Sequence, residues 1–234
     1  MSATAPRADR RVIAIDGPAA SGKSTTARAV AARLGFVHLN SGLLYRAITW
    51  RAMEDGWPPG PDGLEDLLAG VRIDLVPDGT SLDVRIDGEE PGAALFGPAV
   101  SDRVSGIAAA SPVRAFVLER LRAAGQQFDL VCDGRDIGST VFPGADVKVF
   151  LVAAAGERAR RRLLDLGLET TPAVVSREAD RLSLRDAADS GRELSPLRRP
   201  PDAIAIDTTN LSVDEVVDAI LRYARAAGIE CRTS

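Results

Sequence analysis

Hydrophobic residues follow two periods along this chain, and their alternation predicts strands interleaved with helices. Short runs that are apolar throughout are typical of strands buried on both faces of a parallel sheet. Apolar residues spaced by three or four positions predict helices instead. Segments of the two kinds alternate, as in βαβ units whose helices cover a parallel sheet. We expect strands at residues 12–15, 36–39, 130–132, 147–151 and 203–206, and helices at residues 25–34, 41–54, about 64–68, 98–127 with a break at 111–112, and from 212 onward, where Ser212 and Glu215 form a capping box.

The segment between residues 57 and 110 departs from this pattern. Residues 57–61 contain three prolines and cannot form a helix, so they mark a boundary. Residues 71–75 and 82–86 then alternate apolar and polar side chains around Pro77-Asp78-Gly79, which predicts an antiparallel hairpin. We therefore expect one α/β domain: a doubly wound, five-stranded parallel sheet with helices on both faces and a small antiparallel β insertion.

A glycine-rich segment, residues 17–24, lies between the first expected strand and the first expected helix. It reads Gly-Pro-Ala-Ala-Ser-Gly-Lys-Ser and matches the P-loop pattern GxxxxGK[ST]. The glycines let backbone N–H groups and the helix N-terminus point at phosphates, while Lys23 reaches the β- and γ-phosphates. A glycine-rich turn without a ligand is the weaker alternative. We expect ATP to be bound by Gly17, Pro18, Ala19, Ala20, Ser21, Gly22, Lys23, Ser24 and Thr25.

The same segment predicts a magnesium site. In a P-loop the hydroxyl at the position of Ser24 is a ligand of the Mg²⁺ ion that accompanies ATP. Asp16 and Asp133 end strands beside the loop. We expect one of these two carboxylates to orient the ion's shell through water.

Composition excludes several other kinds of protein. Of the 29 Lys and Arg residues, only Lys23 and Lys148 are lysines. One histidine, His38, which is interpreted as an ordinary strand residue, and two distant cysteines, Cys132 and Cys231, argue against a zinc site, a disulfide framework or a Ser-His-Asp relay. A net charge of −4 argues against nucleic-acid binding. The chain starts with polar residues and has no apolar run near the ~20 residues of a membrane span, so we expect a cytoplasmic protein without membrane partners.

The surroundings of the P-loop favour a kinase that acts on a small anionic acceptor. The chain lacks the NKxD motif of GTPases and the LSGGQ segment of transporter ATPases. Its arginines suit a reaction between two phosphates, because guanidinium groups neutralise and orient phosphate oxygens. Arg158 and Arg162 lie on one face of a helix that also carries Arg160 and Arg161, and we expect this pair to close over the transferred phosphate as part of a lid. An exposed basic helix face is the equal alternative.

Several segments resemble bacterial cytidylate kinases, and the resemblance runs from about residue 11 to 227. The matching residues are 15–18, 41–46, 133–138, 141–143, 185–192 and 195–197. The hairpin also resembles the insert that these kinases carry in the region that binds the monophosphate. Such a match in five or more segments, in the same order, is far more specific than the P-loop alone.

The resemblance implies roles for individual residues. Arg46, Arg135 and Arg192 correspond to the arginines that hold the phosphate of the monophosphate. Ser41, Ser105, Arg114 and Asp136 correspond to groups around the cytosine, and Arg185 and Asp189 to the pair that binds the sugar. Together with Lys23 of the P-loop and the helix pair Arg158 and Arg162, the expected catalytic set is Lys23, Arg135, Arg158, Arg162 and Arg192. Asn40 departs from the family, which commonly has Asp before Ser-Gly.

The implied activity is the transfer of a phosphoryl group from ATP to CMP or dCMP, with Mg²⁺ as cofactor. The alternatives are another small acceptor, such as UMP, AMP or shikimate, and a nucleotide-binding module without activity. We expect a monophosphate-binding insert at about 57–110, a helical lid at about 156–192, flexible tails at 1–10 and 228–234, and a monomer.

Overall fold

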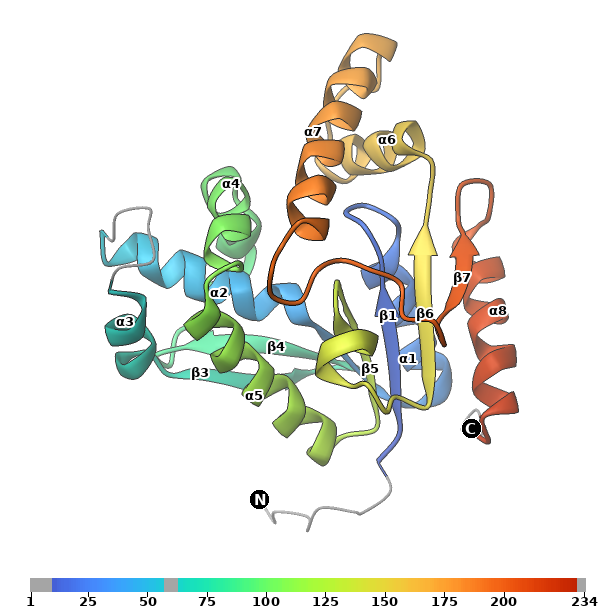
Figure 1. Ribbon diagram of the computed structural model, residues 1–234, viewed down its shortest axis with the longest axis horizontal. Helices are drawn as coiled ribbons and strands as arrows, with labels where there is room; N and C mark the ends of the chain where they lie inside the picture. The colour runs from blue at the N-terminus through green and yellow to red at the C-terminus, as the bar shows by residue number, and fades with distance from the viewer. Residues whose placement is uncertain (1–9, 57–62, 231–234) are drawn as a thin grey trace.

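A sheet of seven strands forms the centre of the molecule (Figure 1), and its strand order is β3-β4-β2-β5-β1-β6-β7. The computed structural model describes residues 10–56 and 63–230, so the boundary expected at residues 57–61 lies outside the described residues. Five neighbouring strands of this sheet are parallel, as predicted, and they lie in the order β2-β5-β1-β6-β7. The strands are β1 (Val12–Asp16), β2 (Val37–Asn40), β3 (Ile73–Asp78), β4 (Ser81–Ile86), β5 (Leu130–Gly134), β6 (Val147–Val152) and β7 (Ile204–Asp207).

Helices cover both faces of this sheet, and alternation along the strands explains why each face is apolar. In β1, Ile13 and Ile15 pack with α1 and α8 on one face, whereas Ala14 packs with α2 and α5 on the other. β5 does the same, with Val131 on the first face and Cys132 on the second. The helices are α1 (Lys23–Leu34), α2 (Ser41–Glu54), α3 (Leu64–Gly70), α4 (Pro98–Ile107), α5 (Ser111–Gln127), α6 (Ala155–Asp165), α7 (Pro172–Ser190) and α8 (Val213–Ala226), with a 3₁₀ helix η1 (Gly92–Phe96) and a π-helix η2 (Ile137–Val141).

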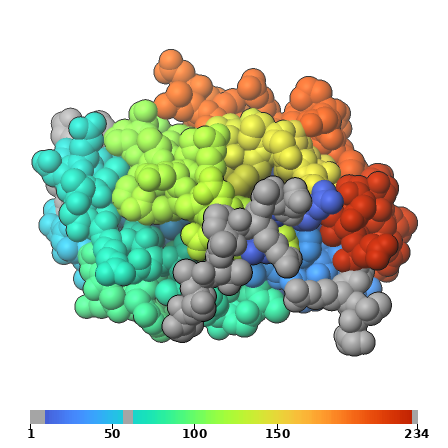
Figure 2. Space-filling model, turned by 90° about the horizontal axis from the view of Figure 1, so that it is seen from below, coloured from blue at the N-terminus to red at the C-terminus, as the bar shows by residue number. Residues whose placement is uncertain are grey.

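The predicted hairpin, β3 and β4, does not stand apart from the parallel sheet. It continues the sheet through one parallel pairing, between His38 of β2 and Ser81 of β4. Alternation also explains this arrangement, because Leu82, Val84 and Ile86 of β4 are buried and join the core beneath α2. Figure 2 shows the hairpin region in teal and α8 in red at opposite ends of the molecule.

Two helical segments stand above the carboxyl ends of the strands (Figure 1). One is α4, in the segment expected to bind the monophosphate, and the other is the pair α6 and α7 in the expected lid. The expected break in the long helical segment separates α4 from α5, with Pro112 in the first turn of α5. Asp102 of α4 and Arg181 of α7 form an ion pair of 2.9 Å between the two segments.

The packed part of the chain extends past the boundary expected at residue 227. Ile229 is only 3% exposed and packs in the core beside α8, so the expected flexible tail does not begin at residue 228. Arg10 lies 3.5 Å from Asp129 at the other end. The expected capping box is confirmed, because Ser212 and Glu215 bond each other's backbone N–H groups. No described helix combines the length and the apolar character that a membrane span requires.

Candidate active site

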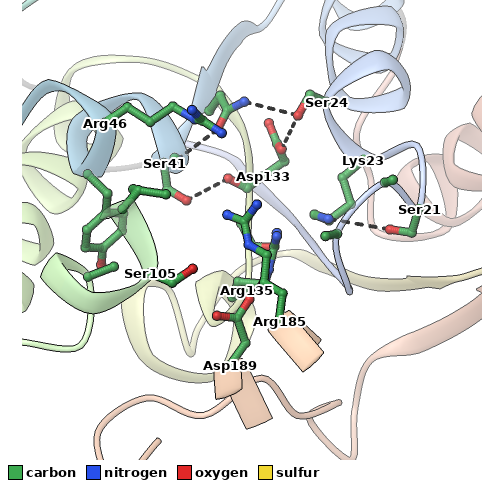
Figure 3. A pocket seen from close by; sticks show the side chains of 18 of the residues that line it. Ser21, Lys23, Ser24, Ser41, Arg46, Ser105, Asp133, Arg135, Arg185 and Asp189 are labelled. Carbon is green, nitrogen blue, oxygen red and sulfur yellow. Dashed lines mark hydrogen bonds and ion pairs between the residues drawn. The ribbon is translucent and has the colours of Figure 1, made fainter. Parts of the chain in front are cut away.

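A pocket of about 280 Å³ lies between the P-loop and the two helical segments. Figure 3 shows Lys23 and Ser24 on one side of it and Arg46 and Ser105 on the other, with Arg135 and Arg185 between them. Most of the predicted site residues line this pocket: residues 19–25, Ser41, Arg46, Ser105, Arg114, Asp133, Arg135, Asp136, Arg162, Arg185, Asp189 and Arg192. Four predicted residues are not among those lining it: Asp16, Gly17, Pro18 and Arg158.

The shape of the P-loop depends on its first glycine. A Cβ atom at Gly17 would lie 2.2 Å from the carbonyl oxygen of Leu151, so no other residue fits there without a backbone shift. Gly22, immediately before α1, has φ of +88°, a conformation that favours glycine. The loop therefore passes close to β6 and delivers the N-terminus of α1 to the pocket.

Lys23 lies buried under this loop. Its Nζ atom donates a hydrogen bond of 2.6 Å to the Pro18 carbonyl and lies 3.5 Å from the Ser21 hydroxyl. Burial lowers the pKa of Lys23 well below its ordinary value, and the positive charge of Arg135 lowers it further. An anionic phosphate would offset both effects, since an opposite charge favours the ammonium form.

The Ser24 hydroxyl has two partners that fix its orientation. It donates a hydrogen bond of 2.7 Å to Asp133 Oδ2 and accepts one of 3.1 Å from the Asn40 amide. A hydroxyl oxygen has two lone pairs, so one remains for a metal ion. No cluster of three His, Cys, Asp or Glu side chains that could hold a metal occurs among the described residues. This donor set fits Mg²⁺, which usually takes one or two protein ligands, substrate phosphates and waters.

Asp16 does not take part in this arrangement. Its two carboxylate oxygens accept hydrogen bonds of 2.8 and 2.7 Å from the backbone N–H groups of Ile137 and Gly138 in η2. Burial raises the pKa of Asp16 to about 6, although these two bonds act in the opposite direction. Of the two aspartates expected near Mg²⁺, only Asp133 contacts Ser24.

The lining of the pocket also includes a buried ion pair. Arg114 of α5 donates to the Asp136 carboxylate and to the Ala108 carbonyl, and its guanidinium lies over the Tyr45 ring. Ser105 also lines the pocket. Ser41 donates a hydrogen bond of 2.9 Å to the backbone carbonyl of Asp133, which ties the start of α2 to the end of β5.

Asp189 connects two of the predicted arginines. Its carboxylate accepts a hydrogen bond of 2.9 Å from Arg135 and another from Arg192. The Asp189 side chain is only 3% exposed. The expected sugar-binding carboxylate therefore also fixes the guanidinium groups that are expected to hold phosphate.

The pocket concentrates positive charge although the chain as a whole is acidic. Burial lowers the pKa of Arg46 to about 10, and repulsion from Arg185, Arg162 and Arg135 adds to the effect. Arg46 nevertheless has fixed partners, the Leu95 carbonyl at 2.8 Å and the Ser101 hydroxyl at 3.0 Å. Within residues 10–56 and 63–230, the guanidinium groups of Arg162 and Arg185 make no hydrogen bond or ion pair.

The comparison with protein-family models identifies the family of this chain. The sequence model of the family described as "Cytidylate kinase" matches residues 13–226. This chain belongs to the cytidylate kinase family.

Curated relatives of this cytidylate kinase family member are longer proteins. A "Bifunctional pantoate ligase/cytidylate kinase" of Synechococcus elongatus is 42% identical over 94% of this chain and 43% of its own length. A protein of the same description from Synechococcus sp. (strain JA-3-3Ab) is 44% identical over 94% of this chain and 41% of its own length. The chain thus spans less than half of these relatives.

A solved structure supports the fold alone. An uncharacterized protein from Eubacterium ventriosum is similar with a TM-score of 0.52 and 12% sequence identity, covering 93% of this chain and 99% of that chain.

In this member of the cytidylate kinase family, Arg162 lines the pocket, whereas Arg158 on the same helix does not. Its guanidinium is buried, donates a hydrogen bond of 3.1 Å to the Ala19 carbonyl and forms an ion pair with Asp186 of α7. Asp186 in turn accepts a hydrogen bond of 3.1 Å from the Ala19 N–H group. Arg158 and Asp186 therefore hold both sides of one P-loop residue and attach the lid helices to the loop.

Sequence reasoning missed three other residues of this cytidylate kinase family member. His38 contacts Asp133, and Asp186 accepts a hydrogen bond from the P-loop. Asn40 caps α2, because its side chain accepts a hydrogen bond of 2.8 Å from the Gly42 N–H group, and its amide also donates to Ser24. Asn40 had a signal, since Asn immediately before a helix is a preferred cap. His38 also had one, because it lies two positions before Asn40 and so faces the same side of β2.

Lys148, the second lysine, has a structural explanation. Its aliphatic stem packs against Gly138, and its ammonium lies 2.6 Å from Asp202. This side chain covers apolar surface while its charge reaches a partner.

Proposed function

We propose that this chain transfers the γ-phosphoryl group of ATP to CMP and dCMP. The observation that carries the proposal is one pocket that is lined both by the P-loop and by the Arg114–Asp136 pair. The family match and the names of the relatives support the same activity.

The Arg114–Asp136 pair suits the edge of cytosine. A cytosine ring offers an amino donor next to a ring-nitrogen and carbonyl acceptor. Asp136 accepts from the amino group, while Arg114 and the Ser105 hydroxyl donate to the acceptors. Uracil presents a carbonyl where Asp136 requires a donor, so UMP leaves buried polar groups unpaired and is disfavoured.

The arginines suit the phosphates. Arg46, Arg135 and Arg192 hold the phosphate of CMP, and Asp189 and Arg185 contact the sugar. Within the part of the chain that the structure describes, the Arg162 guanidinium makes no hydrogen bond or ion pair, so it is free to bind the transferred group. Repulsion among the pocket arginines favours an acceptor that carries at least two negative charges.

Transfer requires no covalent intermediate. Lys23 moves its hydrogen bonds from Pro18 and Ser21 to the β- and γ-phosphates, and Arg135 and Arg162 stabilise the negative charge of the in-line transition state. Ser24, with Asp133 beside it, would hold Mg²⁺, which would supply positive charge that offsets the negative charge of the phosphates. The two helical segments exclude water from the closed pocket.

A coupled ADP-release assay tests the proposal. CMP, dCMP, UMP, AMP and shikimate are compared as acceptors, and CMP and dCMP are expected to give at least about 100-fold higher kcat/KM than the others. Equal rates with all acceptors, or a preference for shikimate, would contradict it. ATP binding without transfer to any acceptor would instead indicate a binding module.

The two lysines offer a matched control for the mechanism. Lys23→Ala is expected to abolish turnover while the fold remains intact, because the phosphates lose their ammonium group. Lys148→Met keeps the stem that packs on Gly138 and is expected to leave turnover unchanged. Light scattering of the same samples tests the further expectation of a monomer.

A further inference from the structure

The single histidine of the chain, His38, has a hydrogen-bond partner at each of its two ring nitrogens. His38 Nε2 lies 2.8 Å from Asp133 Oδ1, and His38 Nδ1 lies 3.3 Å from the Ser81 hydroxyl of β4. The His38 and Asp133 side chains are each only 3% exposed. A carboxylate oxygen can only accept a hydrogen bond, so Nε2 carries a proton in this contact.

Strand alternation places these groups on the face of the sheet that carries α1. Asn40 of β2 is in register with Asp133 of β5, and His38 lies two residues before Asn40. Leu39 and Cys132, between them, face the opposite core with α2 and α5. His38 and Asn40 therefore flank Asp133 next to Ser24, at the start of α1.

Asp133 is thereby held at both oxygens. Oδ1 contacts His38, and Oδ2 accepts the Ser24 hydroxyl proton at 2.7 Å. Rotation of the carboxylate would break both hydrogen bonds. Its orientation in turn decides where the Ser24 proton points and which Ser24 lone pair faces the pocket.

We infer that His38 is a positioning residue for the magnesium site. It fixes Asp133, which fixes the Ser24 hydroxyl with one lone pair toward the metal ion. The inference deepens the proposed function, on which it rests. Outer groups that orient the ligands of a metal affect its affinity without contacting it.

Metal affinity, measured without any acceptor, tests this role. Mn²⁺ is titrated into the complex of the full chain with ADP, and free Mn²⁺ is followed by electron paramagnetic resonance. His38→Phe keeps a ring but has no donor, and it is expected to weaken Mn²⁺ binding about tenfold. His38→Gln can present an N–H group near the Nε2 position and is expected to stay within about threefold of the wild type.

A control separates positioning from packing. Leu39→Met changes a buried neighbour on the opposite face of β2, and it is expected to leave Mn²⁺ affinity unchanged. ADP affinity in the presence of EDTA is expected to be the same in all variants, since the backbone of the P-loop is untouched. If His38→Phe does not fold, as judged by circular dichroism, His38→Leu replaces it.

Three outcomes would overturn the inference: wild-type Mn²⁺ affinity in His38→Phe, equal weakening in His38→Gln and His38→Phe, or no Mn²⁺ binding by the wild-type complex. Failure of the proposed function is a separate result. A wild-type chain that does not phosphorylate CMP removes that function, whereas the Mn²⁺ titration contains no acceptor and still decides the role of His38.

Discussion

Arg114 and Asp136 form an ion pair in the lining of the pocket, and their side chains are only 9% and 6% exposed. Each side chain is fixed by the other, so the pair presents one donor group and one acceptor group at constant positions. A rigid pair of this kind can discriminate between bases that differ at a single exocyclic group.

Replacing the carboxylate of this pair is expected to change base specificity. Asp136→Asn offers an N–H group to the O4 carbonyl of uracil, so kcat/KM for CMP should fall about 100-fold and the preference over UMP should narrow. Arg114 also loses its counter-charge, which lowers the free energy of unfolding by about 3 kcal/mol. Asp218→Asn, an exposed carboxylate on α8, is the control. An unchanged ratio of kcat/KM for CMP and UMP would contradict the assignment.

A glycine at the end of β5 is expected to be essential for packing. A Cβ atom at Gly134 would lie 2.4 Å from the Ser41 hydroxyl and 2.8 Å from the Ile137 side chain. Gly134→Ala should lower the free energy of unfolding by about 1–3 kcal/mol and reduce turnover, because Ser41 and η2 must shift. Gly144→Ala, where nothing lies within 4 Å, should be neutral. Urea denaturation and the ADP assay measure both effects, and equal behaviour of the two variants would refute the steric argument.

Two arginines on one face of α6 are expected to behave differently. Arg158→Met breaks a buried pair with Asp186 and should lower the free energy of unfolding by about 3 kcal/mol. The Arg162 side chain has no partner within the described parts of the chain, so Arg162→Met should change stability by less than about 0.5 kcal/mol. It should lower kcat, since it removes a charge from the pocket. The result to be excluded is equal destabilisation by both.

Asp16 predicts a pH dependence of stability with a definite sign. Its pKa is about 6 in the folded chain, above the ordinary value of 3.8, so the folded state binds the proton more tightly. The contribution is fully present below about pH 4 and is lost as the pH rises through 6. Relative to Asp16→Asn, the wild type should lose about 2 kcal/mol of unfolding free energy between pH 4 and pH 7. Urea denaturation at both values tests this, and a constant difference would count against it.

Elements that depend on local pattern could be predicted from the sequence. The parallel strands, the hairpin and the helix at residues 41–54 follow hydrophobic period, and the P-loop follows a motif. The attachment of the hairpin to β2 could not be predicted, because it rests on one residue pair, His38 and Ser81. Most of the candidate site residues line one pocket because they lie at the carboxyl ends of parallel strands or on the helices above them.

Side-chain partners that are distant in sequence could not be predicted. Arg158 and Arg162 have the same spacing and helix face, and only Asp186, 28 residues from Arg158, separates their roles. Asp16 is a different case, because the alternation of side chains along β1 predicts which face of the sheet its carboxylate lies on. Ile15 faces α1, so Asp16 must face η2 on the other side of the sheet.

The central strand β5 contains a cysteine, Cys132, whose chemical labelling can report when this part of the sheet becomes exposed to water. Cys132 is completely buried between the sheet and the helices, and burial raises the pKa of its thiol well above the ordinary value. Alkylation requires an accessible thiolate, so iodoacetamide can modify Cys132 only when the face of β5 that packs against α2 and α5 opens to water. In a Cys231→Ser background, the rate of labelling therefore measures how often the strand that carries Asp133 is exposed to water.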